Sequence, residues 1–129
     1  MKRTVVAALL SLVLSGATVG AVGAAPTPTY SALLTADSAC AFTLKASWKN
    51  TSIDTVIGIW YQDDEYRFTT QAPLQGPNGG IIRGRTATMH AGPVPVDTAS
   101  HSWRVLVQFY RGGAHQFETN AITDAFCAI

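Results

Sequence analysis

Hydrophobic and polar residues alternate with a period of two along much of the chain, which is typical of strands with one buried face. The pattern is clearest over residues 40–49, where the alternate apolar positions are Cys40, Phe42, Leu44, Ala46 and Trp48. Further strands are predicted over residues 55–62, 66–69, 81 to about 90, 103–110, 116–118 and 121–127. After residue 24 no ten residues keep a helical period, so the sequence predicts an all-β protein.

Turn-forming residues separate the predicted strands. Asn50-Thr51-Ser52 ends the first strand, Asp63-Asp64-Glu65 turns the chain after the second, and Arg111-Gly112-Gly113 predicts a hairpin. Residues 71–80 and 91–100 are rich in Pro and Gly and are predicted to be exposed loops. Short strands joined by such turns favour a single antiparallel β-sandwich.

The N-terminal residues 1–24 have the pattern of a secretory signal peptide. Lys2 and Arg3 form a positive region, residues 5–14 are apolar apart from Ser11, and small residues lead to a predicted cleavage after Ala24. The apolar run is too short to span a bilayer, which takes about 20 residues. We therefore expect a secreted, extracellular protein with an exposed leader over residues 25–38 and the sandwich over residues 39–129.

The net charge and the distribution of charged residues do not indicate a class of binding partner. Without Lys2 and Arg3, seven basic residues are balanced by eight acidic ones, and the basic residues are scattered. A nucleic-acid-binding protein would usually show a basic face, so we expect no nucleic-acid partner. Arg83-Gly84-Arg85 is locally basic, and we interpret it as a solvated strand edge.

The two cysteines, Cys40 and Cys127, lie near the two ends of the predicted domain. In a secreted chain they predict one disulfide, because neither has the spacing of a redox or metal motif. In the loop-entropy account, closing so long a loop stabilises the fold by roughly 4.5 kcal/mol.

Three segments resemble strands of fibronectin type III and related immunoglobulin-like domains. Residues 40–48 resemble the second strand, with a tryptophan that closes the run, and Ile57-Gly58-Ile59-Trp60-Tyr61 is similar to the third. Residues 98–113, followed by Ala121-Ile122, resemble the late hairpin of that family. The resemblance implies an immunoglobulin-like sandwich and no particular activity, and the chain departs from the family in Trp103 and in a disulfide that reaches its C-terminal end.

No group of residues predicts catalysis, a cofactor or a metal site. His90, His101 and His115 could in principle bind zinc, but they lack close spacing, and we interpret them as exposed loop histidines. Asp63-Asp64-Glu65 is too small a set for a calcium loop and is better explained as a turn. Asn50-Thr51-Ser52 fits the glycosylation pattern, which we treat as incidental. We expect a protein without enzyme activity.

A surface hypothesis comes from excess apolar residues on strand faces that should point outward. The residues Val105, Val107 and Phe109 belong to the core face of the late strand, so Leu106 and Tyr110 face away from the core. With Trp60 and Tyr66 from neighbouring strands, Leu106 and Tyr110 would form an exposed ligand-binding patch, with a groove beside Gly58. The alternative is that the N-terminal leader or a twist of the sheet covers these rings.

Two kinds of function follow from these patterns. The first is a small secreted binding or adhesion module, with a carbohydrate or a protein at the cell envelope as its ligand. The alternative is a secreted inhibitor of an extracellular hydrolase, with loops 71–80 and 91–100 as its contact surface.

Overall fold

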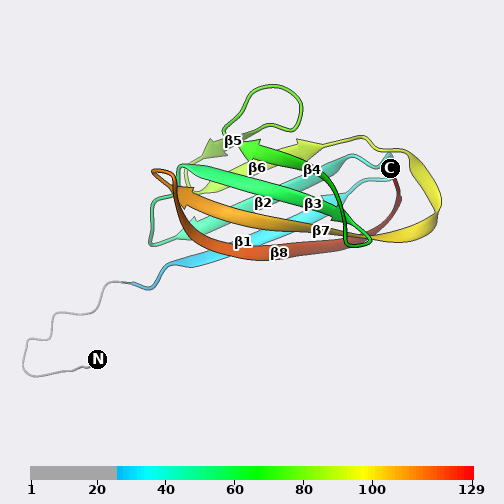
Figure 1. The fold of residues 1–129 in the computed structure, drawn as a ribbon. Helices are drawn as coiled ribbons and strands as arrows, with labels where there is room; N and C mark the ends of the chain where they lie inside the picture. Colours follow the sequence, from blue (N-terminus) through cyan, green and yellow to red (C-terminus); the bar gives the residue numbers. More distant parts are fainter. Residues whose placement is uncertain (1–25) are drawn as a thin grey trace, which may run out of the picture.

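The computed structural model describes residues 26–129 and folds them into two antiparallel sheets. The first sheet has the order β1-β2-β6-β5 and the second the order β4-β3-β7-β8 (Figure 1). The eight strands are β1 (Thr29–Ala36), β2 (Phe42–Lys49), β3 (Thr55–Gln62), β4 (Glu65–Ala72), β5 (Gly80–Arg83), β6 (Thr86–Ala91), β7 (Val96–Arg111) and β8 (Ala114–Cys127). The predicted all-β sandwich is confirmed.

Several strand boundaries differ from the sequence prediction. Residues 29–36 were expected in a leader that is exposed or joins the sheet late, and they do join the sheet: they form β1 and pair along their whole length with β2. The predicted strand over residues 81–90 is a hairpin of β5 and β6, because Gly84 has a positive φ of 59° and turns the chain. The predicted loop 91–100 is shorter, since β7 begins at Val96. The predicted signal peptide, residues 1–24, lies outside the described residues.

The turn between β3 and β4 is built by Asp63 and Asp64, as predicted. Both residues have positive φ angles, 50° and 65°. Such angles match the twist of a hairpin and are tolerated by Asp because its short side chain can bond locally. Gly112 and Gly113 form the corresponding turn between β7 and β8, at φ angles of 57° and 81°.

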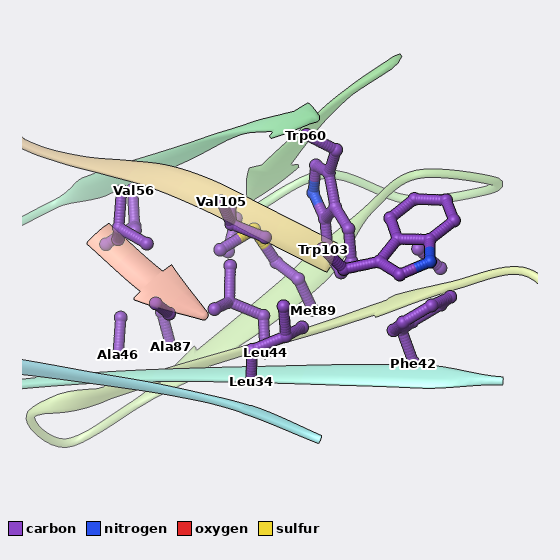
Figure 2. Packing of buried hydrophobic residues seen from close by; sticks show 14 of the residues in the cluster. Leu34, Phe42, Leu44, Ala46, Val56, Trp60, Ala87, Met89, Trp103 and Val105 are labelled. Atoms are coloured by element: carbon purple, nitrogen blue, oxygen red, sulfur yellow. The ribbon is translucent and has the colours of Figure 1, made fainter. Parts of the chain in front are cut away.

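The core lies between the two sheets and is rich in aromatic rings (Figure 2). Phe42 contributes from the first sheet, and its ring centroid lies 5.6 Å from that of Trp60 and 4.6 Å from that of Trp103. Both tryptophans are fully buried. Residues such as Leu44, Met89 and Val105 fill the remaining space between the layers (Figure 2).

The buried indole of Trp60 and the buried hydroxyl of Thr70 have polar partners in the core. Trp60 Nε1 donates to Thr70 Oγ1 at 2.8 Å, and the Thr70 hydroxyl is directed at Met89 Sδ at 3.3 Å. Thr70 therefore satisfies the indole and links the second sheet to the first. An unpaired buried donor would cost stability, so this contact matters to the fold.

Cys40 and Cys127 form the predicted disulfide, with their Cα atoms 5.7 Å apart. Cys40 precedes β2 in the first sheet and Cys127 ends β8 in the second, so the bond joins the two layers. Both cysteines are buried, which is compatible with an extracellular protein. Within residues 26–129, no helix is long and apolar enough to cross a membrane.

We expect Thr70→Val to lower the free energy of unfolding by about 1–3 kcal/mol, because it leaves the buried Trp60 indole without an acceptor. Urea unfolding followed by tryptophan fluorescence measures this. Thr69→Val is the matched control, since Thr69 is exposed on the same strand. Equal losses in the two variants would contradict the assigned role of the Trp60–Thr70 bond.

Replacing both cysteines, Cys40→Ala with Cys127→Ala, should lower the free energy of unfolding by about 2–5 kcal/mol, because the unfolded chain is no longer cross-linked. Urea unfolding of the non-reduced wild type and of the variant measures the difference. A loss below about 1 kcal/mol would show that the bond adds little to the sandwich.

Candidate functional site

The four residues of the sequence-predicted patch do not all reach the surface. Trp60 is fully buried in the core, so its predicted place in an exposed patch is wrong. Gly58 also points inward: a Cβ atom added there would lie 2.8 Å from Thr70 Oγ1, so there is no surface groove beside it. Tyr66 is exposed, and Leu106 and Tyr110 are partly exposed on the outer side of the second sheet.

The outward residues of β3 are the odd-numbered ones, the opposite of the expected set. Burial alternates strictly along this strand, with Val56, Gly58, Trp60 and Gln62 inward. Ile57, Ile59 and Tyr61 are therefore the residues that this strand contributes to the outer side. Tyr61 occupies the place on the surface that was assigned to Trp60.

A β-bulge sets the direction of Tyr66. Trp60 pairs with Phe68 while the next residue, Tyr61, pairs with Tyr66, so the register shifts by one residue between them. Phe68 turns inward and its ring stacks on Trp60 at a centroid distance of 5.1 Å. Tyr66 turns outward, 56% exposed, with its ring 6.2 Å from that of Tyr61. Bulges commonly redirect a side chain in this way.

Strand register places these residues beside outward residues of β7 and β8. Tyr61 pairs with Arg104, and Arg104 pairs with Ile122, which is 64% exposed. In the next outward row, Ile59 pairs with Leu106 and Leu106 with Asn120. We call this surface the outer face; it comprises Ile57, Ile59, Tyr61, Tyr66, Arg104, Leu106, Gln108, Asn120 and Ile122.

Arg104 is held over the outer face by three neighbours. Its guanidinium lies 4.2 Å from the centroid of the Tyr61 ring, a cation–π contact. Its Nη1 donates to Asn120 Oδ1 at 3.1 Å, and its Nε lies 3.6 Å from the Asp64 carboxylate. The arginine is thus oriented before any partner arrives, which lowers the entropy cost of binding.

Tyr110 lies on the same side of the sheet but away from Tyr66. Tyr110 pairs with Thr55 at one end of β3, whereas Tyr66 pairs with Tyr61 near the other end. Six residues of strand separate these positions, roughly 20 Å. Tyr110 donates to Gln108 Oε1 at 2.9 Å and makes an edge contact with His115. The predicted residues therefore form a strip along the sheet and not one compact patch.

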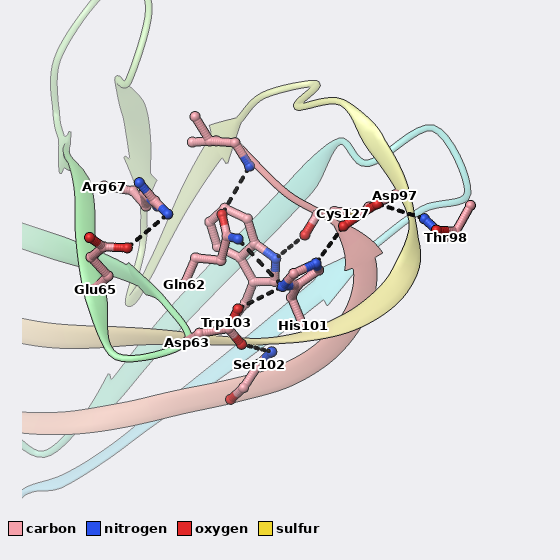
Figure 3. A network of polar contacts seen from close by, with 11 residues as sticks. Gln62, Asp63, Glu65, Arg67, Asp97, Thr98, His101, Ser102, Trp103 and Cys127 are labelled. Atoms are coloured by element: carbon pink, nitrogen blue, oxygen red, sulfur yellow. Dashed lines mark hydrogen bonds and ion pairs between the residues drawn. The ribbon is translucent and has the colours of Figure 1, made fainter.

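The three histidines lie apart in the structure and differ in environment. His90 is exposed on β6 and His115 is exposed on β8. His101 differs from the expected exposed loop histidine, because it is a partly buried residue of β7 between two carboxylates (Figure 3). Its Nδ1 lies 2.6 Å from Asp63 Oδ2 and its Nε2 lies 2.6 Å from Asp97 Oδ2.

The two carboxylates contact opposite edges of the His101 ring, so they do not converge on one point where a cation could sit. Within residues 26–129, no cluster of three or more His, Cys, Asp or Glu residues has the arrangement of a metal site. Asp63 also accepts a hydrogen bond from the Ser102 backbone amide at 3.0 Å. This arrangement ties the β3–β4 turn to β7.

The same hydrogen bonds change the protonation of these groups. Hydrogen bonds to Asp63 and Asp97 raise the pKa of His101 above its ordinary 6.5. The bond to His101 lowers the pKa of Asp63 and of Asp97 below 3.8. The imidazolium donates from both ring nitrogens, whereas a neutral ring carries one N–H and can donate to one carboxylate.

The loop between β4 and β5 is the most prominent projection of the sandwich (Figure 1). Leu74 and Gly80 exchange two backbone hydrogen bonds at 3.0 Å, and Gly79 donates to the Gly76 carbonyl at 3.2 Å. The loop is therefore closed on itself through backbone bonds. It does not present an extended segment.

Comparisons with known proteins give no relative to which the site can be matched. No family model, no curated protein and no solved structure matches the chain.

We expect the stability contribution of His101 to be fully present below about pH 6.5, the ordinary pKa of histidine, and to be lost as pH rises through its raised pKa in the fold. The contribution of Asp63 and Asp97 is present above their ordinary pKa of 3.8 and is lost at lower pH as the two carboxylates become protonated.

The melting temperature of the wild type should therefore fall on raising the pH above neutrality, and this fall should be smaller in His101→Asn. Thermal unfolding by circular dichroism between about pH 5 and pH 9 measures both curves. His115→Asn is the control, because His115 is exposed on β8. Parallel curves for the wild type and His101→Asn would contradict the prediction.

Proposed function

We propose that this chain is a secreted, non-catalytic binding module that recognises a protein through the outer face. The observation that carries the proposal is the composition of this face: aliphatic and tyrosine side chains surround an arginine that is already oriented. Protein interfaces combine such an apolar centre with a polar rim and are enriched in Tyr and Arg. The rim here is formed by Gln108, Glu118 and Asn120.

The arrangement of aromatic rings favours a protein over a carbohydrate. A sugar chain is usually bound on flat, open aromatic rings, because a pyranose stacks its face on the ring. The Tyr61 ring is covered by Arg104, and Tyr66 stands at 75° to it. These two rings do not form one platform. Ile57, Ile59, Leu106 and Ile122 instead provide the aliphatic surface that a protein side chain can contact.

We further propose that the sandwich is immunoglobulin-like. The strand orders β1-β2-β6-β5 and β4-β3-β7-β8 correspond to strands A-B-E-D and C′-C-F-G of such domains. A buried tryptophan on the third strand, here Trp60, is also characteristic. The disulfide Cys40–Cys127 differs, because it joins the ends of the layers instead of their centre. Domains of this architecture commonly bind partners, but the fold alone assigns no activity.

The inhibitor alternative has less support. A loop that blocks a protease has to enter the substrate cleft as an extended segment, whereas residues 74–80 are closed by backbone hydrogen bonds. The second predicted contact loop, residues 91–100, is shortened by the start of β7. The outer face is therefore the better candidate surface.

The test is the double variant Tyr66→Ala with Ile122→Ser, both exposed and thus not expected to affect folding. Tagged wild type and variant are used to capture proteins from the medium and cell surface of the producing culture, with quantification by mass spectrometry. The matched control is Leu33→Ser with Ile81→Ser, two exposed apolar residues of the first sheet, 61% and 53% exposed.

We expect at least one protein that the wild type and the control retain and that the outer-face variant loses. Titration calorimetry with that purified protein should give about ten-fold or greater weakening, since the variant removes two exposed apolar side chains of the outer face and the loss of an interface anchor costs more than about 1 kcal/mol. Ultracentrifugation of the isolated protein tests whether the partner is a second copy. Equal retention by all three proteins would overturn the proposal, and so would glycan binding that the outer-face variant alone loses.

A further inference from the structure

The outer side of the first sheet has a different chemistry from that of the second. Apart from the exposed Leu33 and Ile81, its outward residues are mainly hydroxyl-bearing or cationic, because most apolar residues of these strands alternate toward the core. They include Ser31, Thr35, Thr43, Lys45, Ser47, Lys49, Arg83, Thr86, Thr88 and His90. This surface lies across the sandwich from the outer face.

Charge is segregated between the two sheets. Strands β1, β2, β5 and β6 contain no Asp or Glu, and they carry Lys45, Lys49 and Arg83, with Arg85 in the turn that joins β5 to β6. Among residues 26–129, no carboxylate lies within ion-pair distance of these four cations. On the second sheet, by contrast, Arg67 pairs with Glu65 at 3.1 Å.

A pocket of about 460 Å³ opens at one end of this surface. Its lining includes the hydroxyl residues Ser31, Ser47 and Thr86 and the cations Lys49 and Arg85. The three hydroxyl residues form one row across the sheet, since Ser47 pairs with Ser31 on one side and with Thr86 on the other. Ser47 Oγ and Thr86 Oγ1 are 3.2 Å apart.

A backbone contact brings the two cationic residues of the pocket lining together. The Trp48 amide donates to the Arg85 carbonyl at 3.1 Å, which fixes the β5–β6 turn beside the end of β2. Lys49 follows Trp48 directly, so the same contact brings the backbone of Lys49 close to that of Arg85. Arg83-Gly84-Arg85, interpreted from sequence as a solvated strand edge, is thereby combined with a lysine and a hydroxyl row from distant parts of the chain.

We propose that this pocket binds the charged unit of an acidic polysaccharide. Serine and threonine hydroxyls both donate and accept hydrogen bonds, so they suit the hydroxyl groups of a sugar. Lysine and arginine donate only, and they suit the carboxylate or sulfate that the same sugar unit carries. The proposal concerns the first sheet and does not depend on protein binding by the outer face.

The test measures binding of the purified protein to three oligosaccharides of equal length by titration calorimetry. One is sulfated (a heparin fragment), one is carboxylated (an oligogalacturonate) and one is neutral (a dextran fragment). We expect both acidic sugars to bind and the neutral one not to. Affinity should fall on raising salt from about 0.05 M to about 0.5 M, because the ions screen the cations.

Lys49→Gln and Arg85→Gln should each weaken binding about ten-fold, the loss expected for one hydrogen bond to a charged group. Arg111→Gln removes the same charge at the β7–β8 hairpin and should have little effect. Ser47→Ala should weaken binding of the acidic sugars without changing the charge of the protein. All of these residues except Ser47 are exposed, so the variants are expected to fold.

Three results would overturn the proposal. The first is equal affinity for the acidic sugars and for dextran, and the second is an equal loss of sugar affinity in Arg85→Gln and Arg111→Gln. The third is binding of a polyphosphate of equal charge that depends on Lys49 but not on Ser47. The last result would indicate a nonspecific anion site. Tyr66→Ala with Ile122→Ser should leave sugar binding unchanged, which separates this proposal from the one for the outer face.

Discussion

The burial of Trp60 is the constraint on which the second sheet depends. Its indole is fully buried, stacks on Phe68 and donates to Thr70, so it cannot turn outward without leaving a large cavity and an unpaired donor. Because successive side chains of a strand point to opposite sides, the position of Trp60 directs Ile59 and Tyr61 to the surface. The residues that β3 contributes to the outer face follow from this one buried residue.

The end of β8 is joined to the rest of the sandwich by several independent contacts. Besides the disulfide, the Trp103 indole donates to the Cys127 carbonyl at 2.9 Å, and the Ile129 amide donates to Gln62 Oε1 at 2.9 Å (Figure 3). His101, with Asp63 and Asp97, lies at the same end. Near the start of β8, the Phe117 ring stacks on the Tyr30 ring of β1, with 4.4 Å between the ring centroids. The two layers are thus closed where β1 and β8 meet.

The outward surfaces of the two sheets differ in chemistry. The outer face of the second sheet is apolar at its centre, and its arginine is neutralised by Asp64, whereas the first sheet presents unneutralised cations among hydroxyls. A small sandwich with such opposite sides can contact two different molecules at once, because the layers that carry them are held rigidly together.

The sequence by itself determined the all-β class, the positions of β2 and β3, the turns at Asp63-Asp64 and Gly112-Gly113, and the pairing of Cys40 with Cys127. These features depend on alternation, local turn chemistry and the presence of two cysteines, and each can be found within a short stretch of chain. The inward side of β7 was also found, since Val105, Val107 and Phe109 form a continuous apolar set, whereas the alternate set contains Arg104 and Gln108.

Only the tertiary structure decided the features that the alternation of apolar and polar residues leaves open. In β3 both alternating sets are apolar, so the sequence could not say which points inward; the large Trp60 opposite the small Gly58 was the signal that could have favoured the correct set. The bulge that exposes Tyr66 and the pairing of β1 with β2 depend on neighbouring strands. So does the pocket that joins Lys49 to Arg85, because residues 36 positions apart come together only when β6 pairs with β2.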